Sequence, residues 1–277
     1  MNTAMQLKTL IRNLAKNKGI NPQTLLRNYM FERLLERVSA SKYKHNFILK
    51  GGMLISAIVG IASRSTMDMD VTIKGIPVSK ESIKRMFEEI LKININDNVN
   101  MRINNVSDIR IEEDYAGFSV NLTTIFDGII QNLKIDITTG DKITPYEINY
   151  KFKLLFEDRM IDVLAYNLET VIAEKLETII SRGTTNTRMR DFYDIYILTK
   201  VKADNMDQKL LCKAITETIN QRGKDFKFEN KDLIVFEVKE SSLMKDLWRR
   251  YQKNYSYAEN VSWEEVLNAV EKVIYIL

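Results

Sequence analysis

Two aspartates separated by one residue form the strongest chemical signal in the sequence. Asp68 and Asp70 lie in a segment from Met67 to Ile73 that reads Met, Asp, Met, Asp, Val, Thr, Ile, an alternation typical of a strand. On a strand both carboxylates emerge from the same face, with Cα atoms roughly 6.5 to 7 Å apart, so one small cation can bridge them. Carboxylate ligands without a neighbouring His or Cys favour Mg²⁺ or Mn²⁺. As an isolated pair, however, such aspartates are more often simply an exposed strand face.

A third carboxylate strengthens the case for a metal. Asp136 lies in the alternating segment 133–137, which a sheet could place beside the first pair. Three carboxylates on adjacent strands suit in-line displacement at phosphorus: metal ions neutralise the triphosphate, and the third acid completes a second metal site or deprotonates the attacking hydroxyl. A surface aspartate on an edge strand explains Asp136 equally well.

A pair of glycines lies upstream of these acids. Gly51 and Gly52 stand where the apolar run 47–49 meets a helical segment that begins at Met53. Because glycine lacks a β-carbon, phosphate oxygens can approach the backbone N–H groups of a helix N-terminus there. A tight turn with a positive φ would explain the pair alone, so the prediction of a phosphate cradle depends on the nearby acids.

Basic and acidic residues are grouped again in the last third of the sequence. Lys175 and Arg182 lie two turns apart on one predicted helix, and the face they share can meet anionic phosphate. Asp191 and Asp194 share a face of the next helix. The same residues could instead form a salt-bridge network between the two helices. Both interpretations can hold, because a lysine positioned by an acid is also a good triphosphate clamp.

Hydrophobic periodicity predicts the elements that position these side chains. Residues 5–40 read as two helices; the first ends at Gly19, and the second begins at Asn21-Pro22. Further helices are expected from 53 to 61 and from 79 to 93. Strands are expected at 67–73, 101–112, 117–126, 130–138 and 147–156, with turn signals at 114–117 and at Asp127-Gly128. The remaining helices are expected at 168–182, 188–200, 206–221, 240–253 and 262–277. We therefore predict an α/β (α+β) fold with a mixed β-sheet, divided into an N-terminal helical part (1–45), a core (46–160) and a C-terminal helical lobe (161–277).

Composition excludes several other kinds of site. One cysteine, Cys212, excludes an internal disulfide and a cysteine-based zinc site, and one histidine, His45, cannot build a histidine metal cage. The 41 Lys and Arg residues against 37 Asp and Glu permit a local basic face without demanding one. A signal peptide and a membrane-spanning run are both lacking, so we expect a cytoplasmic protein with no membrane partner.

Two regions could contact nucleic acid. The N-terminal helices have the length of a helix-turn-helix, but the charged residues Glu32, Arg33, Glu36 and Arg37 favour a solvated packing helix instead. Basic and aromatic residues are interleaved near the C-terminus, which suits a phosphate backbone and unstacked bases at an RNA end, although amphipathic helices covering a core explain the pattern better. They are Lys224, Lys227, Lys231, Lys239, Lys245, Trp248, Arg249, Arg250, Tyr251, Lys253, Tyr255, Tyr257 and Trp263.

Two blocks of motifs resemble a known family. Leu49-Lys50-Gly51-Gly52, followed by Arg64-Ser65-Thr66-Met67-Asp68-Met69-Asp70, resembles the first motif of the AbiEii/AbiGii toxin family of nucleotidyltransferases. The later runs Ala173-Glu174-Lys175-Leu176, Ser181-Arg182-Gly183 and Arg190-Asp191-Phe192-Tyr193-Asp194-Ile195 are similar to the closing motifs of that family. The resemblance covers roughly residues 5 to 200.

This resemblance implies a core like that of polymerase-beta nucleotidyltransferases, in the toxin half of a bacterial abortive-infection or toxin–antitoxin pair. It implies a nucleoside triphosphate as substrate, Mg²⁺ (or Mn²⁺) as cofactor and a cognate antitoxin, for which we expect a winged-helix DNA-binding regulator; some members add nucleotides to the acceptor end of tRNA. Asp68 and Asp70, joined by Asp136, would hold the metal, and Asp191 or Asp194 would be an active-site acid. The expected nucleotide contacts are Lys50, Gly51, Gly52, Arg64, Ser65, Thr66, Lys175 and Arg182. The glycine–serine start usual in nucleotidyltransferases reads Gly51-Gly52-Met53 here, without the serine.

The expected reaction is attack by an acceptor hydroxyl on the α-phosphorus of a nucleoside triphosphate, with tRNA as the favoured acceptor. Transfer to a protein side chain and transfer of the γ-phosphate remain open alternatives, because the same metal and lysine would serve them. A non-catalytic nucleic-acid-binding regulator that uses the N-terminal helices is the alternative from a different class.

Overall fold

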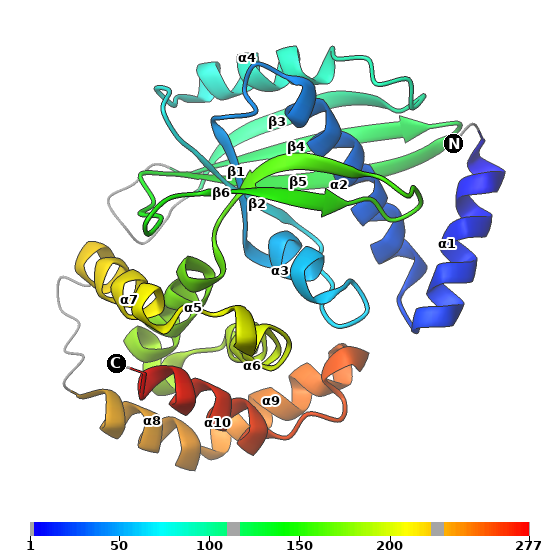
Figure 1. Cartoon of the computed structure of the whole chain (residues 1–277). Coiled ribbons are helices and arrows are strands. Elements are labelled where there is room, and N and C mark those ends of the chain that lie inside the picture. The colour runs from blue at the N-terminus through cyan, green and yellow to red at the C-terminus, as the bar shows by residue number, and fades with distance from the viewer. Residues whose placement is uncertain (1–2, 110–116, 223–229, 277) are drawn as a thin grey trace. The chain divides into compact units, whose positions relative to one another are not determined.

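The computed structural model of the chain describes residues 3–109, 117–222 and 230–276 (Figure 1). Most of the turn predicted at 114–117 and two of the basic residues singled out above, Lys224 and Lys227, lie outside the described residues. The chain forms two compact units: Met1–Asp141 with Glu147–Tyr166, and Lys142–Tyr146 with Asn167–Leu277. In the part of the chain that the structure describes, none of the helices has the length and hydropathy of a membrane span.

Two helices open the first unit, as predicted. Helix α1 (Ala4–Lys18) ends at Gly19, whose φ of 64° is the left-handed conformation that favours glycine at this position. Helix α2 (Pro22–Ala40) begins after Asn21, whose side chain accepts a hydrogen bond from the Gln23 backbone N–H. Helix α2 packs against strands of the sheet and against helix α4 (Lys80–Leu91).

A mixed sheet of seven strands forms the centre of the first unit, in the order β3-β4-β5-β2-β1-β7-β6. Strand β1 runs antiparallel to β2 and parallel to β7, and β2 runs parallel to β5. The strands are β1 (Phe47–Lys50), β2 (Met69–Ile73), β3 (Asn100–Ile109), β4 (Gly117–Phe126), β5 (Ile129–Thr139), β6 (Ile148–Lys153) and β7 (Met160–Ala165). The α/β fold with a mixed sheet is therefore confirmed.

The Asp127-Gly128 signal is confirmed as the turn of the β4–β5 hairpin. Both residues have positive φ, 44° and 79°, and the flanking Phe126 and Ile129 pair with each other. Strand β7 was not predicted. It pairs with β1 through Leu164 and Ala165, so the sheet continues to residue 165. On its other side β7 pairs antiparallel with β6, the strand predicted at 147–156.

The central strands have two chemically different faces. Val71 on β2 and Ile135 and Ile137 on β5 are completely buried and belong to the apolar core. Because side chains alternate along a strand, Asp70 and Asp136 lie on the opposite face. The fold therefore stabilises itself through one face of these strands and leaves the other face for polar chemistry.

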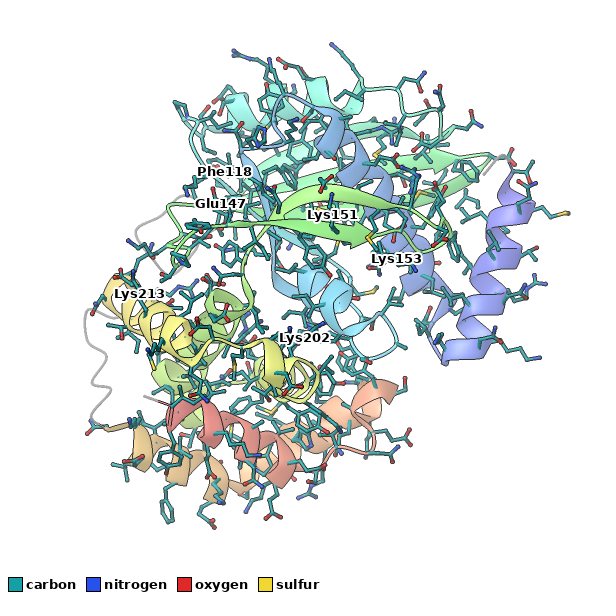
Figure 2. The ribbon with its side chains drawn as sticks, viewed as in Figure 1. Phe118, Glu147, Lys151, Lys153, Lys202 and Lys213 are labelled. Atoms are coloured by element: carbon teal, nitrogen blue, oxygen red, sulfur yellow. The ribbon has the colours of Figure 1, made fainter. Side chains whose placement is uncertain are left out.

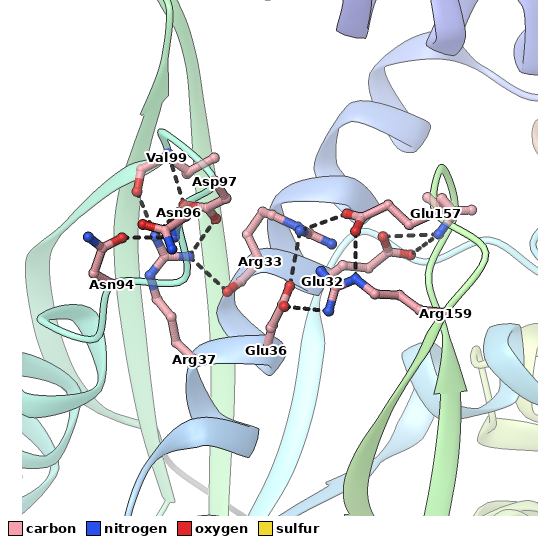
Figure 3. Close-up of polar contacts among 11 residues, drawn as sticks. Glu32, Arg33, Glu36, Arg37, Asn94, Asn96, Asp97, Val99, Glu157 and Arg159 are labelled. Carbon is pink, nitrogen blue, oxygen red and sulfur yellow. Dashed lines mark hydrogen bonds and ion pairs between the residues drawn. The ribbon is translucent and has the colours of Figure 1, made fainter. Parts of the chain in front are cut away.

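Of the charged α2 residues, Glu32, Arg33 and Arg37 are buried and Glu36 is half-buried, contrary to the prediction of a solvated helix. Figure 3 shows their polar contacts. Arg37 binds both carboxylate oxygens of Asp97 at 2.8 Å and donates to the Val99 carbonyl at 2.7 Å. Arg33 lies 3.0 Å from Glu36 and from Glu157, in the segment that joins β6 to β7. Charge thus stays buried on α2 because segments remote in sequence supply its counter-charges. Such a helix face is not available to read DNA.

Removing the negative charge from the Arg37–Asp97 pair should destabilise the first unit. Asp97→Asn leaves the buried guanidinium of Arg37 without its counter-charge, and we expect the free energy of unfolding to fall by about 2 kcal/mol. Chemical denaturation measures this loss. Asp162→Asn is the matched control, because Asp162 pairs with Lys151 at the surface, where both side chains are more than half exposed, and it should change stability by less than about 1 kcal/mol. Equal losses in the two variants would contradict the prediction.

Glu32 gives the first unit a pH dependence. Burial raises the pKa of this glutamate from 4.5 to about 8, against the opposing hydrogen bond from the Leu155 backbone N–H. Between these two values the folded chain holds a proton that the unfolded chain releases, so the free energy of unfolding should fall by a few kcal/mol as the pH rises from 4.5 to 8. Glu32→Gln, which keeps a carbonyl oxygen for Leu155, should flatten that dependence. Denaturation curves at several pH values measure this dependence. If the free energy of unfolding changes equally with pH in the two proteins, the prediction is contradicted.

The second unit is helical. It contains α5 (Leu168–Arg182), α6 (Met189–Lys202), α7 (Gln208–Arg222), α8 (Lys231–Glu240), α9 (Ser242–Asn254) and α10 (Trp263–Ile274), of which α8 was not predicted. Several aromatic residues that were considered for RNA contact form its core. Trp248 and Tyr251 are buried, with rings stacked at 5.4 Å, and the Trp248 indole N–H donates to the Val261 carbonyl. For these two residues the explanation by packing is the correct one.

Candidate active site

Strand pairing brings two of the three predicted acids side by side. Asp70 on β2 is the direct neighbour of Asp136 on the parallel strand β5, and on its other side Asp70 is opposite Lys50 of β1. Neighbouring strands lie about 4.8 Å apart, so three charged side chains follow one another across the same face of the sheet. Asp70 and Asp136 are both half-buried.

Asp68 is placed differently from the prediction. Strand β2 begins at Met69 rather than at Met67, and Asp68 lies in the bend that precedes it, where its carbonyl accepts a hydrogen bond from the Thr66 hydroxyl at 3.1 Å. The relation of Asp68 to Asp70 is therefore set by a bend and not by strand alternation. Sequence periodicity could not show this, because the Met-Asp-Met-Asp alternation continues through the bend.

Asp136 has two protein partners. It accepts hydrogen bonds from Ser119 Oγ at 2.8 Å and from Lys134 Nζ at 2.6 Å. The hydrogen bond to Asp136 raises the pKa of Lys134, and the negative charges of Asp68 and Asp70 raise it further. The charges of all three carboxylates therefore act together on Lys134. Among the described residues, no group of three or more His, Cys, Asp and Glu side chains is gathered closely enough to hold a metal ion.

The donor chemistry of this region nevertheless suits a hard cation. The three aspartates offer carboxylate oxygens, and Mg²⁺ prefers oxygen ligands. Waters and substrate phosphates occupy the other coordination positions of Mg²⁺. A magnesium ion would need only one or two protein carboxylates. Asp70 and Asp136, adjacent across the β2–β5 pair, meet that requirement without a closed protein cage.

The diglycine turn is packed directly against Asp70. Gly51 has a φ of 62°, and a β-carbon added there would lie 2.7 Å from the Asp70 Cγ atom. The Gly52 N–H, at the start of helix α3 (Gly51–Val59), points at an Asp70 carboxylate oxygen 3.4 Å away. A β-carbon at Gly52 would lie 2.7 Å from the Thr66 hydroxyl. Both glycines are thus needed for close packing against the acid and its loop, a reason that applies whether or not phosphate binds there.

Residues 64–66 lie next to this turn. Arg64 is completely buried, with its guanidinium donating to the Ser65 carbonyl and lying against Gly52, while Thr66 is 3% exposed. Asn28 of α2 donates to the Thr66 carbonyl at 3.4 Å. In this structure Arg64 and Thr66 therefore shape the loop that leads to Asp68, and only the half-buried Ser65 is partly open to solvent.

Lys50 belongs to a polar network that the sequence analysis did not identify. Its ammonium lies 2.5 Å from Asp141 and 5.4 Å from the centre of the Tyr166 ring. Asp141 also accepts hydrogen bonds from three hydroxyls, those of Tyr166, Thr72 and Thr138. Burial disfavours the charged carboxylate of Asp141, but the Lys50 ammonium and the threonine hydroxyls outweigh it and hold its pKa at about 2.

This network continues the polar face of the central strands. Thr72 and Thr138 pair with each other two residues along β2 and β5 from the Asp70–Asp136 pair, and therefore lie on the same face of the sheet. Lys50 is therefore fixed by Asp141 beside the acids. The alternation Asp136, Thr138 was readable in the sequence, but Asp141 follows the strand and a glycine, so periodicity gave no signal for it.

Lys175 has the salt-bridge partners considered above, within the second unit. Its ammonium lies 2.5 Å from Asp191 and 3.3 Å from Asp194, and these carboxylates are 1% and 0% exposed. Arg188 binds the other oxygen of Asp191 at 3.0 Å. Asp191 lies in the first turn of α6, where the helix dipole also favours negative charge. The two acids thus fix the lysine, whose side chain remains 14% exposed. Arg182, half-buried, ends the same helix α5.

Comparisons with known proteins identify the family of this chain. The family model for the "Nucleotidyl transferase AbiEii toxin, Type IV TA system" matches residues 33–269. A crystal structure of a putative nucleotidyltransferase from H. pylori is 14% identical, with a TM-score of 0.51 over 93% of this chain and 95% of that chain. The JHP933 protein of Helicobacter pylori is 14% identical, with a TM-score of 0.49 over 92% of each chain. No curated protein matches the chain. Since the family model matches most of the β-sheet unit and most of the helical unit, this chain belongs to the AbiEii nucleotidyltransferase toxin family of type IV toxin–antitoxin systems.

Proposed function

We propose that this chain transfers a nucleotide from a nucleoside triphosphate to an acceptor hydroxyl in a reaction that requires Mg²⁺. The observation that carries the proposal is the packing of the Gly51-Gly52 turn against Asp70, with Asp136 beside it in register. Helix N–H groups that can receive phosphate therefore adjoin carboxylates that can hold a cation. The family supports nucleotidyl transfer as the activity.

We propose a separate role for each acidic and basic residue of the sheet. Asp68, Asp70 and Asp136 would hold the cation, which supplies neutralisation of phosphate charge. Asp136 would exchange its pairing with Lys134 for that role, which leaves the lysine available to phosphate. The acceptor oxygen bonds to the α-phosphorus, the bond from that phosphorus to the bridging oxygen breaks, and pyrophosphate leaves; a carboxylate of the sheet takes the hydroxyl proton.

Lys175 would contact the triphosphate. Asp191 and Asp194 hold its ammonium at a fixed position, which reduces the entropy lost when phosphate binds. Arg182 and Ser65 are the further proposed nucleotide contacts. Lys50, already bound to Asp141, would act on the nucleotide mainly through its charge beside Asp70.

We propose the 3′ end of tRNA as acceptor, and an antitoxin of the winged-helix DNA-binding class as the cognate regulator in a cytoplasmic defence against phage. Support for an antitoxin comes from the type IV family, and support for RNA comes from the half-buried, stacked rings of Tyr255 and Tyr257 beside Arg190. Transfer to a protein side chain, or of the γ-phosphate, would use the same groups.

Labelled triphosphates test the proposal. Purified chain is incubated with Mg²⁺, total tRNA and each of the four triphosphates, labelled at the α- or at the γ-phosphate. We expect α-label on RNA, and its loss when Mg²⁺ is chelated. Label on protein would identify a protein side chain as the acceptor, and transfer of the γ-label would identify the reaction as phosphotransfer. No transfer with any nucleotide would contradict the enzymatic proposal.

A further inference from the structure

A cavity lies in the first unit, beside α3 and the turn that follows this helix. It has a volume of about 470 Å³ and is lined by residues of α1, α2 and α3, the turn at 60–62 and residues 152–155. Cavities of roughly 300 to 1,000 Å³ are the size that proteins use for small ligands. All of its lining residues belong to the first unit.

The interior of this cavity is mainly apolar, with the buried polar side chains of Asn28, Ser56 and one acid, Glu32. Leu14, Met53 and Phe152 line it together with the small side chain of Ala57. The Glu32 carboxyl is 2% exposed and accepts the Leu155 N–H with both oxygens, at 3.1 and 3.2 Å. Burial raises the pKa of Glu32 to about 8, so this carboxyl is largely neutral at pH 7. The interior therefore suits an apolar group and offers little attraction to a cation.

The exposed charged side chains in the lining are both lysines. Lys18 is exposed in the last turn of α1, and Lys153 is exposed at the end of β6, where Figure 2 labels it. The nearest carboxylate to Lys153, that of Asp158, lies 3.9 Å away and is fully exposed, so it offsets little of the charge. With Glu32 neutral, the lining carries a net positive charge at its solvent-exposed edge.

We propose that this cavity binds a small amphipathic anion, with an apolar chain or ring inside and a single anionic group near Lys18 and Lys153. A ligand there would touch two supports of the candidate active site. Helix α3 begins at Gly51, and Asn28, which also lines the cavity, holds the Thr66 carbonyl. Binding itself does not depend on the proposed transfer reaction, so its test is separate from the labelling experiment.

Decanoate is a suitable probe, titrated into the full chain at pH 7 and followed by calorimetry. We expect saturable binding of one decanoate per chain. The double variant Lys18→Glu/Lys153→Glu should raise the Kd for decanoate at least about tenfold, the equivalent of roughly 1.4 kcal/mol. Decyltrimethylammonium, with the same chain and the opposite charge, should bind the unmodified chain at least tenfold more weakly.

The matched control is Lys16→Glu/Lys151→Glu. These lysines are exposed on the same helix and the same strand but do not line the cavity, so the variant has the same net charge and should bind decanoate like the unmodified chain. Ala57→Leu, which narrows the cavity, should weaken binding as well. The proposal is overturned if decanoate does not bind, if the two double variants bind alike, or if the cationic analogue binds as tightly.

Discussion

Asp70→Asn is expected to reduce nucleotide transfer by about a thousandfold while leaving the chain folded. The substitution keeps the shape of the side chain and an oxygen for the Gly52 N–H, but it removes the charge at the centre of the acidic face. Stabilisation of a phosphate transition state by a held cation is worth several kcal/mol, and each 1.36 kcal/mol corresponds to a tenfold change in rate. The measurement is the initial rate of label transfer at saturating triphosphate and Mg²⁺.

Asp108→Asn is the matched control for this experiment. Asp108 is exposed on the outer strand β3 and pairs with Phe118, in line with Ile137, so it lies on the face of the sheet opposite Asp70. It should retain full activity. Raising the Mg²⁺ concentration should recover part of the activity of Asp70→Asn if the lost charge binds a cation. An Asp70→Asn protein that is folded and fully active would remove Asp70 from the mechanism.

Gly51→Ala should reduce transfer by at least about a hundredfold. Two costs combine at this position: alanine at a φ of 62° is strained by roughly 1–2 kcal/mol, and its β-carbon would overlap the Asp70 carboxylate, adding about 1–3 kcal/mol for overpacking. The chain relieves the overlap by moving the turn or the acid, and either movement misplaces the groups that meet phosphate and cation.

Gly19→Ala separates these two costs. Gly19 has nearly the same φ, 64°, but a β-carbon there would meet nothing within 4 Å. This variant should lose roughly 1–2 kcal/mol of unfolding free energy and keep its activity. Thermal unfolding by circular dichroism and transfer rates are measured for both variants. If the two glycine variants lose the same stability and both remain active, the close approach of Gly51 to Asp70 has no functional role.

Local patterns were sufficient to predict much of this protein. The N-terminal helices, the Asp127-Gly128 hairpin and the apolar faces of β2 and β5 follow from periodicity and turn chemistry, which depend on neighbours in the chain. Charged α2 residues were predicted to be solvated, because a single sequence cannot show that Asp97 and Glu157 supply their counter-charges from distant segments. The same limit hid β7, which is recognised through its pairing with β1.

The sequence by itself predicted the candidate residues, which are the aspartates, the diglycine turn and the Lys175 motif, and a resemblance to the family that matches the chain. Tertiary structure decided which of them meet. Strand register places Asp70 beside Asp136 and Lys50, the bend before β2 removes Asp68 from the strand, and Asp141 reaches Lys50 across 91 positions in the chain. The physical reason is that residue type and spacing act locally, whereas register and burial depend on how distant segments pair.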